Sequence, residues 1–263
     1  MWHQLYSMKK NIYGYCLLLL GSYLISVLCS ISLHANHAMA VDLRYEWISG
    51  NQYEVFLYFY FDCNSTIQDT PPNNPPITIS SSTCGQLFTA NLQEDTNISG
   101  DNVSQLCPTA FSSCNGGSYP GVEQYIYRHI IALPENCPDW TISYQLPTGQ
   151  TRSADITNLF TPDFYRLYTE ATLNNTLAGN NSPTIGSIAV PYFCANEHTF
   201  IQSLIDPDGD SLVYSLVPPL DSPNNAIPYI GGLNSQNPLN GSLSIDPENG
   251  DISFSPLGAQ RPV

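Results

Sequence analysis

The sequence predicts an all-β protein built from two consecutive β-sandwich domains, and three observations support this prediction. Short segments of alternating apolar and polar residues recur along the chain after residue 40. They are separated by turn-forming residues, which include 21 Pro and 17 Gly. After residue 40 there is no amphipathic run of helical period that reaches twelve residues. Many short strands between closely spaced turns are typical of sandwiches of the immunoglobulin-like kind.

The first 40 residues are typical of a secretory signal peptide. Lys9 and Lys10 supply a positive end, and residues 16–28 form an apolar run. Ala38-Met39-Ala40 provides the small residues that signal peptidase needs, so we expect Val41 to be the first mature residue and no membrane span to remain after cleavage. An uncleaved signal anchor is the alternative, because the apolar character continues beyond the run.

The first domain is expected to span residues 41–180. Segments 41–47 and 53–61 alternate strictly around Ser49-Gly50-Asn51, which predicts a β-hairpin. The same alternation predicts further strands at residues 77–80, 86–92, 122–133, 139–146 and 164–173.

The second domain is expected to span residues 184–263, after a segment rich in Asn, Gly, Ser and Pro. The predicted strands in this domain are residues 190–193, 199–205, 212–217, 242–245 and 251–255. No closing strand follows, and a sandwich that lacks one exposes a sheet edge. We therefore expect an incomplete domain, because the chain is a fragment of a longer protein or because a partner supplies the strand.

Six of the eight cysteines lie beyond the leader, and an even number in an exported chain predicts disulfides rather than a metal-thiolate site. The six are Cys63, Cys84, Cys107, Cys114, Cys137 and Cys194. The pairs Cys107–Cys114 and Cys63–Cys84 are favoured, because each links the ends of a turn-rich stretch and the first closes a short loop. Cys137 with Cys194 then follows by elimination.

Charge and motifs exclude several classes of function. The formal net charge is −15, and such a surface repels nucleic acids. We find no nucleophile, zinc-protease, P-loop or dinucleotide motif, so we expect no enzymatic activity. A glycosidase with two distant carboxylates is not recognisable from sequence, and it stays open as an alternative.

The candidate metal ligands are Asp206, Asp208 and Asp210 in the segment Asp-Pro-Asp-Gly-Asp. Carboxylates at positions i, i+2 and i+4 of a tight turn offer the hard oxygen ligands that Ca²⁺ prefers. A solvated acidic turn is the alternative interpretation.

Phe56, Tyr58 and Tyr60 share one face of the segment 53–61. Such a row can stack on sugars, although packing in a core is the commoner role of aromatic residues in strands.

The residues also resemble a known family. The matching segments, in order, are Asp42-Leu-Arg-Tyr-Glu-Trp47, Gly50-Asn-Gln-Tyr-Glu-Val55, Tyr60-Phe-Asp-Cys-Asn64, Ser80-Ser-Ser-Thr-Cys-Gly85, Cys114-Asn-Gly-Gly117, Pro120-Gly-Val-Glu-Gln-Tyr125, Asn136-Cys-Pro-Asp-Trp140, Ile142-Ser-Tyr144, Glu170-Ala-Thr-Leu-Asn-Asn175, Asn181-Ser-Pro183 and 206–216. This ordered set resembles the start of the gliding-motility-associated, PKD-domain adhesin-like surface proteins of gliding bacteria. The last segment is similar to cadherin-like or bacterial immunoglobulin-like modules.

The resemblance implies export, through the type IX secretion route, to the outer surface of the cell or the extracellular space. It implies a non-enzymatic role in adhesion or gliding motility, with other surface modules or extracellular polysaccharide and protein as partners. It also implies Ca²⁺ at the Asp-rich turn. The chain departs from the family at Gln145-Leu146-Pro147 and at Asn180, where the family carries further cysteines. The alternative function is a carbohydrate-binding or carbohydrate-cleaving ectodomain.

Overall fold

The described part of the chain is all-β, as expected. The computed structural model describes residues 38–63, 71–104, 106, 109–119, 121–153, 156–185, 198–201 and 204–256. Helical structure in this part of the chain is limited to two single 3-10 turns, η1 (Ser113–Asn115) and η2 (Pro162–Phe164). Within the same residues, no helix reaches the length and apolar character needed to cross a membrane.

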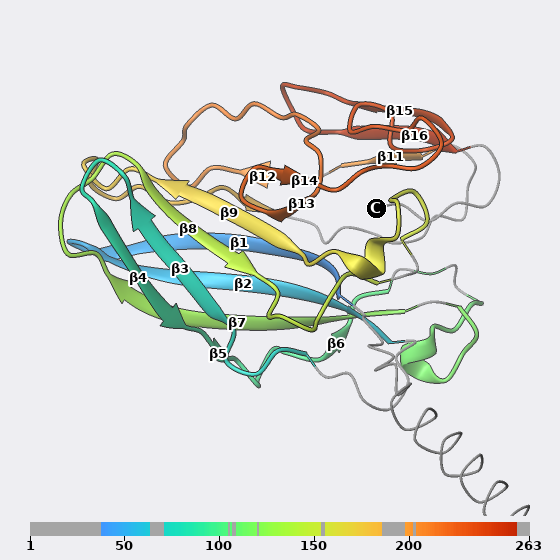
Figure 1. Cartoon of the computed structure of the whole chain (residues 1–263), viewed down its shortest axis with the longest axis horizontal. Coiled ribbons are helices and arrows are strands. Elements are labelled where there is room, and N and C mark those ends of the chain that lie inside the picture. The colour runs from blue at the N-terminus through green and yellow to red at the C-terminus, as the bar shows by residue number, and fades with distance from the viewer. Residues whose placement is uncertain are drawn as a thin grey trace, which may run out of the picture. The chain divides into compact units, whose positions relative to one another are not determined.

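The predicted hairpin forms the start of the first sheet (Figure 1). Strand β1 (Ala38–Ser49) pairs antiparallel with β2 (Gln52–Asp62), and Gly50 adopts the left-handed φ of 52° that the turn requires. On its other side β2 pairs with β7 (Val122–Ala132) along its whole length. Two short strands, β5 (Gln93–Glu94) and β6 (Asp101–Asn102), complete the sheet beside β7.

The second sheet has six strands in the order β14-β13-β9-β8-β3-β4. Their bounds are β3 (Pro76–Ser81), β4 (Gln86–Asn91), β8 (Trp140–Gln145), β9 (Tyr168–Leu173), β13 (Leu220–Ser222) and β14 (Asn225–Ala226). The last two come from beyond residue 184, so strand pairing continues across the expected domain boundary, with Leu220 opposite Tyr168.

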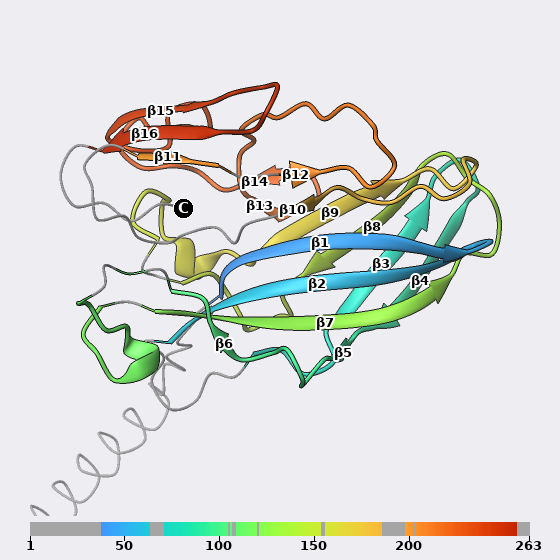
Figure 2. The same cartoon turned by 180° about the vertical axis from the view of Figure 1, so that it is seen from behind.

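The two sheets pack face to face as a β-sandwich around one hydrophobic core, and Figure 2 shows the first sheet from its outer side. Alternation explains this core, because every second side chain of a strand points to the same face. The largest fully buried side chains are Trp140, Tyr53, Tyr127, Tyr144, Phe59 and Leu57, which come from both sheets.

The rest of the C-terminal part forms two small sheets. Strand β10 (Thr184–Ile185) pairs with β12 (Leu204–Ile205), and β16 (Ile252–Pro256) pairs with both β11 (His198–Phe200) and β15 (Gly241–Ile245). The predicted strand at 190–193 lies outside the described residues. The division of the chain into two immunoglobulin-like domains, 41–180 and 184–263, stays a prediction.

The turn between β15 and β16 requires glycine at position 250. Gly250 has φ 76°, and its N–H donates to Asp246 O at 2.9 Å. A Cβ at this position would lie 2.7 Å from the ring of Tyr214, so the close approach excludes a side chain.

The predicted strand at 212–217 is wrong. The segment belongs to no strand, and Val213 and Val217 are 86% and 71% exposed. Its extended course alternates as a strand does, but Pro218 and Pro219 follow it and lack the N–H groups that would continue a ladder.

The predicted disulfide pairings are wrong, although four of the six cysteines are oxidised. The bonds are Cys63–Cys114 and Cys84–Cys137, at opposite ends of the sandwich. Strand pairing explains both. Asp62 lies opposite Val122 in the first sheet, and Ser81 lies opposite Trp140 in the second, which brings residues distant in sequence to the same end. Cys107 and Cys194 lie outside the described residues.

Candidate functional site

The acidic segment 206–210 forms the tight turn that the sequence predicts. Asp206 Oδ1 accepts hydrogen bonds from the backbone N–H groups of Asp208 (2.8 Å) and Asp210 (3.2 Å). Gly209 has φ 81°, a conformation that glycine adopts without strain. One carboxylate therefore organises the backbone of the turn.

Asp208 connects this turn to the first sheet. Its two carboxylate oxygens accept hydrogen bonds from Asn181, whose own Oδ1 accepts one from the backbone N–H of Trp47 (2.7 Å). Beside it, Ser182 and Tyr45 exchange backbone and side-chain hydrogen bonds. Residues 181–182 therefore cover the outer edge of β1, which would otherwise present unpaired backbone groups.

The three aspartates do not form a compact ligand set in this arrangement. Among the described residues, two sets of three potential ligands have ligand atoms within 4.8 Å of one another: Cys63, Cys114, Glu123 and Cys84, Glu135, Cys137. Because these cysteines are in disulfides, neither set offers a thiolate. Calcium at the turn stays a prediction.

The aromatic row lies on the outer face of the first sheet. Phe56, Tyr58 and Tyr60 are half-buried and belong to neither hydrophobic core, so their interpretation as core residues is wrong. The rings of Phe56 and Tyr58 stack at 26° with their centroids 6.4 Å apart. The result is a partly accessible aromatic strip along β2.

Charged side chains flank this strip. Arg44 on β1 lies over the Tyr58 ring, 4.4 Å from its centroid, and forms an ion pair with Asp42. On the other side Arg128 of β7 pairs with Asp95 at 2.9 Å and with Glu54 at 3.5 Å. Burial raises the pKa of the Tyr58 hydroxyl, and the positive charge of Arg44 opposes that rise. The hydroxyl is a neutral hydrogen-bonding group at physiological pH.

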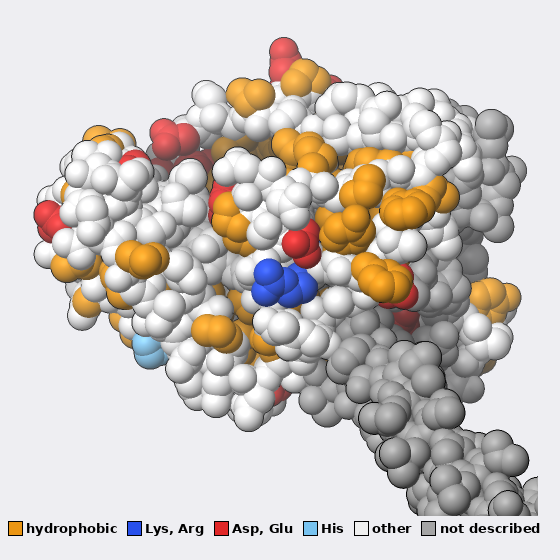
Figure 3. All heavy atoms as spheres, in the orientation of Figure 1, with side chains coloured by type: hydrophobic (Ala, Val, Ile, Leu, Met, Phe, Trp, Pro, Cys, Tyr) orange, Lys and Arg blue, Asp and Glu red, His pale blue; other side chains and the backbone are white. Residues whose placement is uncertain are grey.

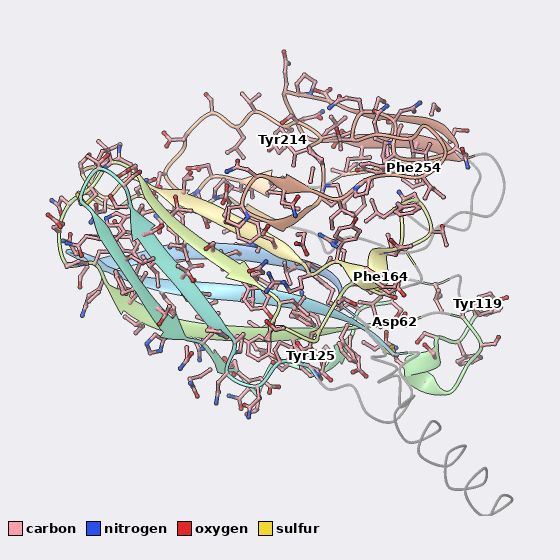
Figure 4. The ribbon with its side chains drawn as sticks, viewed as in Figure 1. Asp62, Tyr119, Tyr125, Phe164, Tyr214 and Phe254 are labelled. Carbon is pink, nitrogen blue, oxygen red and sulfur yellow. A yellow bond between two sulfur atoms is a disulfide. The ribbon has the colours of Figure 1, made fainter. Side chains whose placement is uncertain are left out.

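A third feature was not predicted from the sequence. A cavity of about 820 Å³ lies between the edge of the sandwich and the C-terminal part. Its walls include the segment 216–220 and side chains of β15 and β16, among them Phe254, which Figure 4 labels. Hydrophobic side chains also gather on the surface over η2 and these strands (Figure 3). The cavity contains one buried cation, Arg152, whose burial no sequence pattern signals.

Comparison of the chain with protein-family models, with curated proteins and with solved structures finds no match. The resemblance to gliding-motility adhesins therefore stays a prediction.

Proposed function

We propose that the chain is a non-enzymatic attachment module of the cell surface or extracellular space. The observation that carries the proposal is the pair of disulfides, each joining segments more than 50 residues apart at one end of the sandwich. Disulfides that hold distant segments of a fold together persist in oxidising compartments outside the cytoplasm. The proposal includes cleavage of the leader after Ala40, export by the type IX route and a part in gliding motility.

The way in which the C-terminal part is held supports a structural role. It contributes β13 and β14 to the sandwich sheet, and Asn181 ties its acidic turn to β1. Two independent sets of hydrogen bonds restrain it, as expected of a module that transmits force between a cell and a surface.

Two measurements test this proposal. Intact producing cells are treated with protease or with a membrane-impermeant label, and the chain is expected to be accessible. Recovery of the chain only from lysed cells, with reduced cysteines, would overturn the location.

Beads coated with the oxidised chain are then tested on polysaccharide-coated and protein-coated surfaces. Reduced and alkylated chain serves as the control. Retention equal to that of the control would overturn the attachment role.

A second candidate function is carbohydrate binding at the aromatic strip. The stacked rings of Phe56 and Tyr58, with Arg44 beside them, favour it, because sugar rings pack on aromatic faces while charged groups bind their hydroxyls. Titration of soluble polysaccharides would show affinity lost in Tyr58→Ala and kept in Leu87→Ala, a change at an exposed position of β4. Release of reducing ends would instead indicate a carbohydrate-cleaving enzyme.

The proposal also includes Ca²⁺ at the acidic turn. Each carboxylate oxygen of Asp208 accepts one hydrogen bond and keeps a lone pair for a cation. Asp206 accepts its two hydrogen bonds from the turn on Oδ1, which leaves Oδ2 as its ligand atom. Millimolar Ca²⁺ is expected to raise the melting temperature, and Asp210→Asn is expected to reduce that rise. If the melting temperature is the same in chelator and in Ca²⁺, the turn does not bind the metal. That result leaves the attachment role unaffected.

A further inference from the structure

Arg152 is a buried cation without a counter-ion in the described part of the chain. Arg152 is only 6% exposed to solvent, and no described carboxylate lies within ion-pair distance of its guanidinium. Nη2 donates to Leu220 O at 3.3 Å, whereas the buried Nε has no hydrogen-bond partner. A guanidinium has five N–H donors, so most of the donor capacity of Arg152 is not used by these bonds.

Asp221 is the acid that most affects Arg152, but its carboxylate has other partners. Its Oδ1 accepts from the backbone N–H of Arg166 at 2.6 Å, and its Oδ2 accepts from the side-chain amide of Asn225 at 3.4 Å. Burial lowers the pKa of Arg152 to about 10, and the negative charge of Asp221 only partly opposes that effect. The guanidinium is therefore charged at neutral pH and poorly compensated.

Arg152 lines a cavity that is otherwise largely apolar. The volume of about 820 Å³ is in the range of sites for small ligands. The apolar part of its wall includes Ile156, Leu216, Val217, Leu239, Leu243 and Phe254. A ligand that suits this wall has a hydrocarbon body, since burying apolar surface is its main source of affinity.

Two further polar groups restrict the charge of the ligand. Tyr229 also lines the cavity, and the positive charge of Arg152 opposes the rise that burial causes in the pKa of its hydroxyl. The Tyr229 hydroxyl is thus a second polar group in the electrostatic range of Arg152. Glu170 lines the cavity as well, and its carboxylate accepts a hydrogen bond from Tyr168 at 2.5 Å. This negative charge, with the formal net charge of −15, disfavours a multiply charged anion.

We propose that this cavity binds a single-chain monocarboxylate, with the carboxylate at Arg152 and the alkyl chain along the apolar wall. Arg and carboxylate form paired, charge-assisted hydrogen bonds, and such a pair supplies the counter-charge that the buried guanidinium lacks. Tyr60, at one end of the aromatic strip, also lines the cavity, whereas Phe56 and Tyr58 do not. Met39 and Ala40 line it as well, so the site is tested on a chain that keeps these two residues. The site does not depend on the attachment role.

The test uses the purified chain with its disulfides intact, titrated calorimetrically with decanoate and with decan-1-ol. Decanoate is expected to bind with one-to-one stoichiometry, and the alcohol about tenfold or more weakly, because it lacks the charge that Arg152 recognises. Arg152→Met is expected to lose that preference. Its fold should be kept, because replacing an uncompensated buried charge by an apolar side chain of similar size is tolerated.

Two variants complete the test. Arg128→Met removes an exposed arginine of β7 and should leave decanoate binding unchanged. Val217→Trp, at an exposed position of the wall, should weaken binding of both ligands by filling the cavity. Equal affinity for acid and alcohol, full binding by Arg152→Met, or no saturable binding by the natural chain would each overturn the proposal. If Arg152→Met fails to fold, the ligand comparison and Val217→Trp decide.

Discussion

Asn181 holds the carboxylate of Asp208 with two hydrogen bonds, from its backbone N–H to Oδ2 at 2.6 Å and from its side-chain amide to Oδ1 at 2.7 Å. The Oδ1 of the same asparagine accepts from the N–H of Trp47 on β1. One side chain therefore joins the edge of the first sheet to the acidic turn.

The first prediction concerns this bridge. Asn181→Ala is expected to cost about 1 kcal/mol of unfolding free energy and to speed hydrogen exchange at the Trp47 amide, because that donor loses its acceptor. Urea titration and exchange mass spectrometry measure the two effects. Asn91→Ala, at an exposed position of β4, is the control. Unchanged exchange at Trp47 would contradict the bridge.

Asn175 is a buried hub between the loop before β8 and the strand itself. Its Oδ1 accepts from Cys137 N at 2.7 Å and from Trp140 Nε1 at 3.1 Å, and its amide donates to Glu135 O. Asn175→Ala leaves these buried groups unpaired and should cost about 3 kcal/mol in urea unfolding. Asn174→Ala, at its half-buried neighbour whose Oδ1 accepts hydrogen bonds from Thr176 in an exposed turn, should cost less. Similar losses in both variants would refute the hub.

The disulfides give a covalent test. Non-reducing peptide mapping is expected to recover Cys63 linked to Cys114 and Cys84 linked to Cys137. Replacing either pair by serine should lower the unfolding free energy by about 4 kcal/mol in the chain-entropy model, given loops of 51 and 53 residues. A recovered link between Cys63 and Cys84 would disprove the topology.

Asp139 makes stability depend on acidity. Hydrogen bonds from the hydroxyl of Ser81, the N–H of Thr83 and the hydroxyl of Ser82 hold the pKa of Asp139 well below its ordinary value of 3.8. The folded state therefore binds this proton less readily than the unfolded state. The resulting stabilisation is complete above about pH 4 and is lost as the pH falls through the depressed pKa.

Urea unfolding at pH 7, 4, 3 and 2 checks this. The advantage of the natural chain over Asp139→Asn should shrink steadily below pH 4. Asp163→Asn, an exposed carboxylate of η2, is the control. A constant advantage from pH 7 to pH 2 would be inconsistent with the depressed pKa.

Two core tyrosines carry hydroxyls without partners. The buried hydroxyls of Tyr127 and Tyr144 have no hydrogen-bond partner, and burial raises the pKa of both. Tyr144→Phe is expected to stabilise the chain by about 1 kcal/mol, because an unpaired polar group leaves the core. Tyr45→Phe should do the opposite, since that hydroxyl donates to Thr172 O at 2.8 Å. If the melting temperatures of both variants shift in the same direction, this explanation is contradicted.

The strands of the sandwich were predictable from the sequence where one face is buried. Along β2, Val55, Leu57 and Phe59 point into the core and alternate with half-buried residues, so the period of two is visible in the sequence. Where no ladder forms, the same pattern misleads. Leu212, Tyr214 and Leu216 alternate equally well, yet they lie in an irregular segment.

What could not be predicted depends on contacts between residues distant in sequence. Cys84 meets Cys137 because β3 pairs with β8, and local loop length carries no information about that pairing. Arg152 sits in a loop with no periodicity, and its contacts are with residues distant in sequence, among them Ala38 and Leu220. The acidic turn was visible in sequence, but its partner Asn181 was not.

The start of β1 has a consequence for the order of events during export. Ala40 and Val41 lie opposite Tyr60 and Phe59 in the finished ladder, and Ala38 O accepts a hydrogen bond from Ser153 N. A peptide bond inside a ladder is shielded from proteases until the strand opens. If the leader is removed after Ala40 as proposed, signal peptidase must cut while the chain is still threading and unpaired, before the hairpin closes.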